Sequence, residues 1–307
     1  MKRKRRMLLC LLLTITAALL VLVVVLREKA SRTPSYHYEM SKELRLSFSN
    51  ADLVIQEIRE ALERHDYRIY IRYQASDGYM NDVMPLVNEL MTWAVADTDS
   101  PTQGDYIRYQ MGGYDVNYSR TDLEDGSANY LITITPVYYT KTAQEAAVDQ
   151  DVEEILQEVD IDCCSSDLEK VEAIYDYVYS HVKYDSIHKS SEYHLKSTAY
   201  AALERGIAGC QGYAVAMYRL LEEAGVDCRV ITGMAEYEGE SEFHAWNIVE
   251  VDGTYYNLDI TWDCRLGERE YFLKGQETFT DHIRDEEFET KDFLTQYPTS
   301  EQDFSGI

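Results

Sequence analysis

Residues 243–263 read FHAWNIVEVDGTYYNLDITWD, in which two strand-like runs flank the dipeptide Asp252-Gly253. Both runs are rich in aromatic and β-branched residues, which favour strands. Asp-Gly between such runs is a strong signal of a two-residue hairpin turn. The stretch therefore predicts an antiparallel hairpin made of residues 243–251 and 254–263.

This hairpin brings two polar side chains together. With a two-residue turn, His244 faces Thr261 and Asp259 faces Trp246. Because side chains alternate along a strand, His244 and Asp259 become diagonal neighbours on one face of the hairpin. We therefore expect an imidazole to meet a carboxylate there.

Upstream, residues 209–214 read GCQGYA, and Cys210 begins a helical pattern that stops at Gly225. Its apolar positions are Ala214, Met217, Tyr218, Leu220 and Leu221. A helix that begins at Cys210 puts the sulfur at the positive end of the helix dipole, which favours the reactive thiolate. Taken alone, the same cysteine is equally consistent with a buried or disulfide-bonded residue.

The hairpin changes that balance. A carboxylate that holds one imidazole nitrogen orients the ring and leaves the other nitrogen to accept a proton from a thiol. Cys210, His244 and Asp259 are therefore the candidate nucleophile, general base and orienting group. The reaction also needs oxyanion or substrate-positioning groups. Backbone N–H groups at the start of the Cys210 helix are candidates, as are Tyr200, Gln211 and Trp246.

Three segments in this order, 209–214, 244–247 and 259–263, resemble motifs of the transglutaminase-like superfamily, a branch of the papain-like cysteine enzymes. The likeness covers roughly residues 165–285 and suggests a bacterial, membrane-anchored member. It implies the same catalytic triad, and we expect that triad to work through a thioester intermediate. The sequence has neither a Gly-rich phosphate-binding loop nor a calcium loop of regularly spaced acids, so we expect no cofactor. Where Ile260 and Tyr256 stand, many relatives have Pro and Trp, but neither position belongs to the triad.

The resemblance leaves the reaction open, because such families include cross-linkers, peptidases, glycan-amide hydrolases and catalytically silent domains. Two hypotheses follow: a cysteine enzyme that acts on a protein or peptide of the cell envelope, and a silent domain that serves as a cell-surface binding or assembly module. The resemblance also suggests that the segment with Tyr271, Phe272 and His282 is a C-terminal extension like one in bacterial members.

The fold class expected is α+β, with a papain-like or transglutaminase-like core in which a helix-borne cysteine packs on an antiparallel sheet that carries the histidine and the aspartate. We predict three parts: residues 1–35, 36–160 and 161–307. They comprise a basic stub with anchor and stalk, an α+β domain with a linking helix, and the catalytic domain. Hydrophobic periodicity predicts a helix that Asn50 caps and helices over 81–95 and 142–158, with strands over 67–73, 105–119 and 128–140. Ser166 and Glu169 have capping-box spacing, which predicts a further helix start.

Residues 7–26 contain no charged side chain, and as a helix they would reach about 30 Å, enough to span a bilayer. Five cations, Lys2 to Arg6, precede this run, so the positive-inside rule predicts a cytoplasmic N-terminus and an extracytoplasmic catalytic domain. A cleaved signal peptide is the competing interpretation, but the apolar run is long and lacks a typical cleavage site.

The chain is acidic, with 55 Asp and Glu against 29 Lys and Arg, and a formal net charge of -26. Such a surface repels phosphate backbones, so we expect no nucleic-acid partner. Among the six cysteines, Cys228 and Cys264 lie in neighbouring strand-like segments and are the favoured disulfide pair, whereas adjacent Cys163 and Cys164 cannot easily bond to each other. His181, His188 and His194 do not share a face, and the cysteines lack zinc spacing, so no metal is expected.

Overall fold

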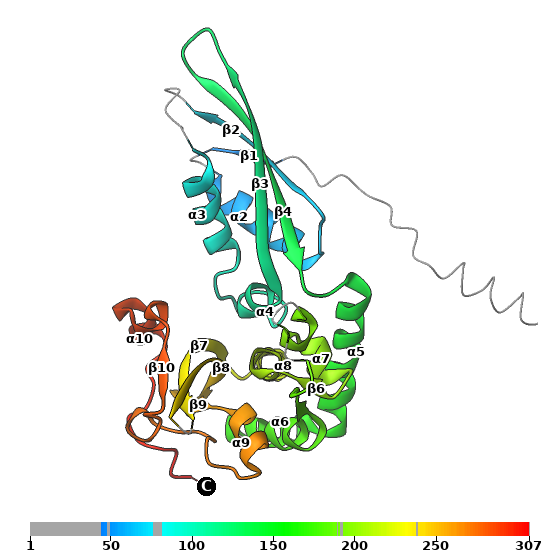
Figure 1. The fold of residues 1–307 in the computed structure, drawn as a ribbon, viewed down its shortest axis with the longest axis vertical. Helices are drawn as coiled ribbons and strands as arrows, with labels where there is room; N and C mark the ends of the chain where they lie inside the picture. The colour runs from blue at the N-terminus through cyan, green and yellow to red at the C-terminus, as the bar shows by residue number, and fades with distance from the viewer. Residues whose placement is uncertain are drawn as a thin grey trace, which may run out of the picture. The chain divides into compact units, whose positions relative to one another are not determined.

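The fold is mixed α+β, as the sequence predicted (Figure 1). The computed structural model describes residues 44–47, 50–75, 82–188, 190, 193–237 and 239–306, which belong to one unit, Ser41–Ile307. The expected anchor, residues 7–26, lies outside the described residues. Among the helices that are described, none combines the length and the apolar character needed to cross a bilayer.

The first module is a four-stranded sheet with two helices. The strand order is β1-β2-β4-β3, in which β1 runs parallel to β2 and the other pairs are antiparallel. Its elements are β1 (Leu44–Leu46), α2 (Ala51–Glu63), β2 (Ile69–Ala75), α3 (Met84–Ala94), β3 (Met111–Asp122) and β4 (Ala128–Tyr138). Figure 1 shows β3 and β4 as a long hairpin. Gly126, with φ 85°, confirms the expected turn.

Three local expectations for this part of the chain and the next need correction. Residues 105–109 form the short helix α4 (Asp105–Tyr109) rather than the start of a strand, because Asp105, Tyr106, Ile107 and Tyr109 are all buried, a pattern that no half-exposed strand satisfies. Asn50 precedes α2, but its side-chain oxygen accepts from Ser47 instead of capping the helix. Ser166 caps α6 as expected, whereas Glu169 accepts from Ser165 instead of Ser166.

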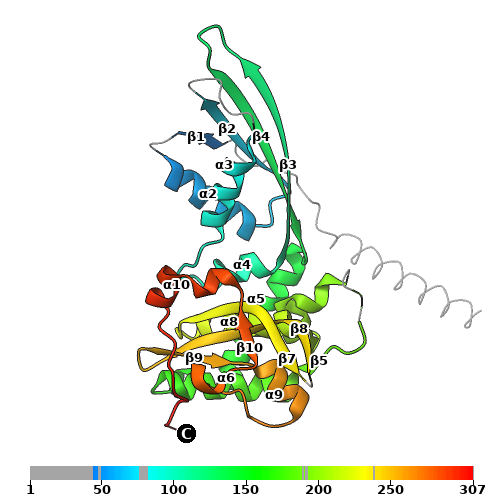
Figure 2. The same ribbon diagram turned by 60° about the vertical axis from the view of Figure 1, so that its left-hand side comes forward.

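The second module places helices against another antiparallel sheet, with strand order β10-β7-β8-β9 (Figure 2). Its helices are α5 (Thr142–Glu158), α6 (Asp167–His181), α7 (Ala199–Leu203), α8 (Cys210–Glu223), α9 (Ile260–Leu266) and α10 (Lys291–Gln296). Its strands are β5 (Lys183–Tyr184), β6 (Ile207–Ala208), β7 (Cys228–Tyr237), β8 (Glu240–Val251), β9 (Thr254–Leu258) and β10 (His282–Arg284). The short helices η1 (Ile161–Cys163), η2 (His194–Ser197), η3 (Gln276–Thr278) and η4 (Glu286–Glu289) connect them.

Both faces of this sheet are covered. On one face, Ala245 and Val249 of β8 share a core with the buried side of α8, and the Asn247 amide donates to the Ala214 carbonyl of α8 at 3.0 Å. On the other face, Trp246 and Ile248 share a core with aromatic residues of the C-terminal segment. The sheet is therefore a middle layer between two hydrophobic cores.

The β8–β9 hairpin has the predicted register. Val251 pairs with Thr254, and the ladder continues to Asn247 opposite Leu258. Asp252 and Gly253 both have positive φ, 53° and 80°, as a type I′ turn requires. The strand then stops at Leu258, short of the predicted end at residue 263, and the chain turns into α9.

A buried ion pair links α4, the short helix directly before β3 of the first module, to the sheet of the second module. The Asp105 carboxylate accepts from Arg229 Nε at 2.8 Å, Arg229 Nη2 at 3.1 Å and the Val230 backbone N–H at 2.8 Å. The Arg229 guanidinium also lies 4.5 Å from the centre of the Tyr297 ring. Because the Asp105 and Arg229 charges neutralise each other inside the protein, this pair fixes the position of α4 relative to β7.

We expect Asp105→Ala to lower the free energy of unfolding by about 3 kcal/mol, because it leaves the Arg229 charge buried without its main partner. Urea denaturation followed by circular dichroism measures the change. Asp122→Ala is the matched control, since the Arg120–Asp122 pair is exposed and removing it should cost no more than about 0.5 kcal/mol. Equal losses of stability in the two variants would contradict the stabilising role of the buried Asp105–Arg229 pair.

Candidate active site

Cys210 is the first residue of α8, as predicted, and its side chain is half-buried. The preceding Gly209 donates its backbone N–H to the Lys196 carbonyl at 2.9 Å, which fixes the approach to the helix. Gly212 allows the first turn to pack closely, because a Cβ there would lie 2.5 Å from the Lys196 oxygen. Gly212 thus serves close backbone approach, and the sulfur stands at the positive end of a 14-residue helix.

His244 and Asp259 are in contact: His244 Nε2 lies 2.7 Å from Asp259 Oδ2, and both residues are buried. The contact is the one expected, but its geometry is not. Asp259 does not continue the strand opposite Trp246, and Thr261 does not face His244, because Asp259 is the N-cap of α9. The sheet therefore carries the histidine, while the aspartate stands at the start of a helix.

The Asp259 carboxylate accepts four hydrogen bonds. Oδ1 accepts from the backbone N–H groups of Thr261 and Trp262 at 3.0 and 3.2 Å, and Oδ2 is shared by His244 and by His282 Nε2 at 3.1 Å. A carboxylate has about four acceptor positions, so this group is fully used. Capping explains why Asp stops the strand here, since an Asp side chain satisfies the free N–H groups of a helix start.

The buried pair shifts both protonation equilibria toward the charged forms. Burial acts to lower the pKa of His244, but the Asp259 charge and hydrogen bond outweigh it, and a hydrogen bond with the Cys210 side chain adds to the rise, to about 10. Burial acts to raise the pKa of Asp259, but His244 and then His282 hold it well below the usual range. At neutral pH the arrangement favours an imidazolium beside the Cys210 sulfur.

Around the sulfur lie groups from further elements. Burial raises the pKa of Tyr184 on β5, and the charge at Cys210 raises it further. The Arg265 guanidinium lies 4.9 Å from the centre of the Tyr184 ring and pairs with Glu242 at 2.9 Å. Tyr184, Arg265 and Glu242 thus add aromatic and charged side chains on this side of the site, and none of the three was singled out from the sequence.

The other predicted site residues have defined places. Gln211 follows Cys210, and its side-chain amide donates to the Tyr109 carbonyl of α4, so it links the nucleophile helix to the first module. Trp246 is buried on β8 and its indole N–H donates to Asn257 Oδ1 at 3.4 Å. Tyr200 lies half-buried in α7. Their roles in substrate or oxyanion binding stay predictions.

The favoured disulfide between Cys228 and Cys264 is wrong. All five described cysteines are free. Cys228 begins β7 inside the core beneath α8, where the Asn247 amide contacts its sulfur at 3.4 Å, whereas Cys264 lies on α9. The predicted pairing required the strand after the Asp252-Gly253 turn to reach Cys264, but that strand, β9, ends at Leu258.

His244, Asp259 and His282 are the described residues whose ligand atoms could in principle hold a metal ion, since these atoms lie within 4.8 Å of one another. The two imidazole nitrogens lie only 2.7 and 3.1 Å from the shared carboxylate oxygen. Ligands around a tetrahedral zinc ion are about 3.3 Å apart. The spacing is that of direct hydrogen bonds.

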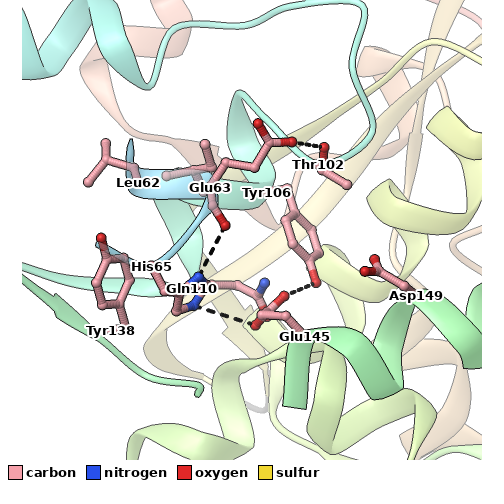
Figure 3. Close-up of a pocket in the computed structure, with 10 residues that line it drawn as sticks. Leu62, Glu63, His65, Thr102, Tyr106, Gln110, Tyr138, Glu145 and Asp149 are labelled. Carbon is pink, nitrogen blue, oxygen red and sulfur yellow. Dashed lines mark hydrogen bonds and ion pairs between the residues drawn. The ribbon is translucent and has the colours of Figure 1, made fainter. Parts of the chain in front are cut away.

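A separate cavity of about 130 Å³ lies among α2, α4, β4 and α5 (Figure 3). Tyr106 donates to Glu145 Oε2 at 2.7 Å across it, and His65 Nε2 lies 3.9 Å from the other oxygen of that carboxylate. Neither the candidate nucleophile nor its histidine and aspartate line this cavity. The candidate active site therefore lies outside this cavity, and we identify it from the side-chain contacts of Cys210, His244 and Asp259.

Residues 153–260 match the family model described as the transglutaminase-like superfamily, a segment that includes Cys210, His244 and Asp259. The chain therefore contains a transglutaminase-like domain. It is similar to the kyphoscoliosis peptidase of Homo sapiens, with 28% identity over 141 residues, and to that of Mus musculus, with 30% identity over 126 residues.

These matches cover 42% and 38% of this chain, but only 20% and 18% of the two relatives. Among solved structures, a TGase has 19% sequence identity and a TM-score of 0.35, with 75% of this chain and 58% of the other covered.

The raised His244 pKa predicts a pH-dependent stability difference. A histidine with a folded pKa of about 10 and an ordinary value of 6.5 contributes stability that is fully present below pH 6.5 and is lost as pH rises through 10. We expect His244→Gln to cost on the order of a few kcal/mol near pH 6 and clearly less near pH 10. Urea denaturation at both pH values measures this difference, and a cost that does not change with pH would contradict the charged pair.

Proposed function

We propose that this chain is a cysteine enzyme that cleaves amide or peptide bonds, with Cys210 as nucleophile, His244 as general base and acid, and Asp259 as the orienting group. The observation that supports it most is the buried His244–Asp259 pair at 2.7 Å, whose imidazole also interacts with the Cys210 side chain. The transglutaminase-like domain and the peptidase names of the two relatives point in the same direction.

The proposed reaction has two stages, acylation of Cys210 and hydrolysis of the thioester, and His244 transfers the protons in both. His244 Nε2 is held by Asp259, which leaves Nδ1 to take the thiol proton. The Cys210 thiolate then attacks the carbonyl carbon, and a C–S bond forms as the carbonyl becomes an oxyanion. When this intermediate collapses, the C–N bond breaks and the amine leaves with the proton from His244. Water next attacks the thioester, His244 takes its proton, the C–S bond breaks, and acid and thiol are released.

The oxyanion needs hydrogen-bond donors that are already in place. The first N–H groups of a helix have no acceptor within that helix, so the start of α8 supplies such donors beside the sulfur. This makes the helix useful twice, because its dipole favours the thiolate before attack and its N–H groups face the oxyanion afterwards. The side chain of Gln211 is less available, since it already donates to Tyr109.

The acyl group could pass to water or to an amine. Water would give a peptidase or a deamidase, and a lysine side chain would give a cross-linker. We favour hydrolysis, because water is always present, whereas transfer requires a dedicated amine site. The peptidase names of the two relatives agree with this preference. The substrate would be a protein or peptide of the cell envelope.

We also propose that residues 7–26 anchor the chain in the cell membrane, with the N-terminus cytoplasmic and the catalytic domain outside. The uncharged run and the preceding cations support this arrangement. We expect the full chain to stay with the membrane fraction after an alkaline carbonate wash, and Leu19→Arg with Leu22→Arg to weaken that retention. Complete release of the unchanged chain would contradict the anchor.

Alkylation tests the proposed nucleophile. At neutral pH, iodoacetamide should label Cys210 before the other described cysteines, and Cys210→Ser should remove that fast label and the activity. Cys264 is the matched control, because it is also half-buried and burial raises its pKa to about 11, which leaves on the order of one thiolate in ten thousand at pH 7. Peptide mass spectrometry locates the label.

The same assay separates the two functional hypotheses. A silent binding or assembly module predicts that Cys210 reacts no faster than Cys264. An enzyme predicts fast labelling and, with a peptide substrate, an acyl group on Cys210 that mass spectrometry detects after acid quenching. If only cleaved peptide or ammonia accumulates when amine donors are present, the cross-linking version is abandoned.

A further inference from the structure

A second histidine lies behind the candidate triad. His282 is the first residue of β10, and its ring bridges two carboxylates: Nε2 lies 3.1 Å from Asp259 Oδ2, and Nδ1 lies 2.8 Å from Asp281 Oδ1. Its side chain is fully buried. Tyr271 donates its hydroxyl to the other oxygen of Asp281 at 2.7 Å. The contacts form a continuous chain from Tyr271 through Asp281, His282 and Asp259 to His244.

The bridge gives each ring nitrogen of His282 a carboxylate partner. An ionised carboxylate only accepts hydrogen bonds, so a ring nitrogen that carries a hydrogen finds its acceptor already in place. Both carboxylates are held in the ionised form: although burial acts to raise the pKa of Asp259 and of Asp281, hydrogen bonds and charge from their histidine partners keep both values low.

Aromatic side chains enclose the His282 ring. The ring stacks on Phe279, with 3.9 Å between ring centres and an interplanar angle of 19°. The rings of Trp262 and Trp246 lie 4.5 and 5.0 Å away. Phe279 and the two tryptophans therefore hold the ring in place and keep water away from it.

We propose that His282 is a positioning residue of the active site: held by Asp281, it fixes the Asp259 carboxylate from the side opposite to its helix-capping contacts, and so fixes the orientation of His244. This inference rests on the proposed function of the triad. His282 itself contacts neither the sulfur nor the expected place of the scissile bond. It acts through Asp259, whose Oδ2 it shares with His244.

The backbone is shaped to bring this histidine in. β10 pairs with β7, and His282 lies opposite Ala235. Gly233 lies two positions along, opposite both His244 on β8 and Arg284 on β10. A Cβ at Gly233 would lie 2.0 Å from the Ile283 carbonyl oxygen, so only glycine lets β10 approach this closely. The strand that packs against Gly233 from the side opposite to His244 is thus the one that delivers His282.

Nitrogen-15 NMR of histidine-labelled full-length protein tests the hydrogen-bonded bridge. We expect His282 to show a ring N–H that is hydrogen-bonded and protected from solvent exchange, assigned by its loss in His282→Phe. A ring N–H that exchanges freely with solvent would overturn the bridge. This measurement does not depend on catalysis, so it can fail while Cys210 still reacts rapidly, and it can succeed while the proposed enzyme fails.

The rate of Cys210 alkylation tests the positioning role. His282→Phe keeps the aromatic packing and removes both hydrogen bonds, so we expect the rate to fall at least about tenfold. The thermal midpoint should fall as well, because the buried Asp259 carboxylate loses one of its donors. His282→Gln, which keeps one donor within reach of Asp259, should retain more than about a third of the wild-type rate. His181→Phe is the matched control, because that exposed histidine bonds its own helix at Tyr177, and it should leave the rate unchanged.

Asp281→Ala provides a second test, because it leaves the contact between His282 and Asp259 in place and so separates positioning from stability. The Asp281 side chain is one-third exposed, so its loss should leave the fold intact while it releases Nδ1 of His282. We expect a severalfold slower alkylation of Cys210 than in the unchanged protein. Wild-type rates in both His282→Phe and Asp281→Ala would overturn the positioning role, whereas slow alkylation of Cys210 in the unchanged protein would instead reject the proposed function.

Discussion

The Asp259 carboxylate is the constraint on which the rest of the site depends. Burial of an ionised carboxylate is costly unless every acceptor position is filled, and here two backbone N–H groups and two imidazoles fill them. Those donors come from α9, β8 and β10, so three elements must be in register before the charge is compensated. The same contacts that make the buried charge tolerable also determine which way the His244 ring points.

Much of this arrangement could be predicted from short-range signals. Asp252-Gly253 indicated the turn, and with it the register from Val251–Thr254 to Asn247–Leu258, which the structure reproduces. The position of Cys210 at a helix start followed from the glycine before it and the apolar pattern after it. The contact of His244 with Asp259 was correct even though the strand ends at Leu258, because capping and pairing both bring residue 259 to the strand end.

What the sequence could not supply were contacts between segments distant in the chain. His282 follows Asp281 in a stretch without clear periodicity, and only the closure of β10 on β7 reveals that its ring meets Asp259. Residues 105–109 were predicted as the start of a strand because the local pattern does not show that Asp105 is buried. Its burial depends on Arg229, 124 positions away. The prediction that the strand continues to Cys264 was wrong for a local reason. Asp259 caps a helix and so ends the strand, and apolar alternation alone does not show such an ending.

Gly233 has a consequence that reaches beyond its own strand. Since the carbonyl of Ile283 occupies the space that any side chain at position 233 would need, the smallest possible mutation there, a single methyl group, would force two neighbouring strands apart. The residue carries no functional group, yet it stands beside His244 in the ladder and governs the seating of the strand that bears His282. A position without any side chain thus constrains the active site as strictly as the residues that carry the functional groups.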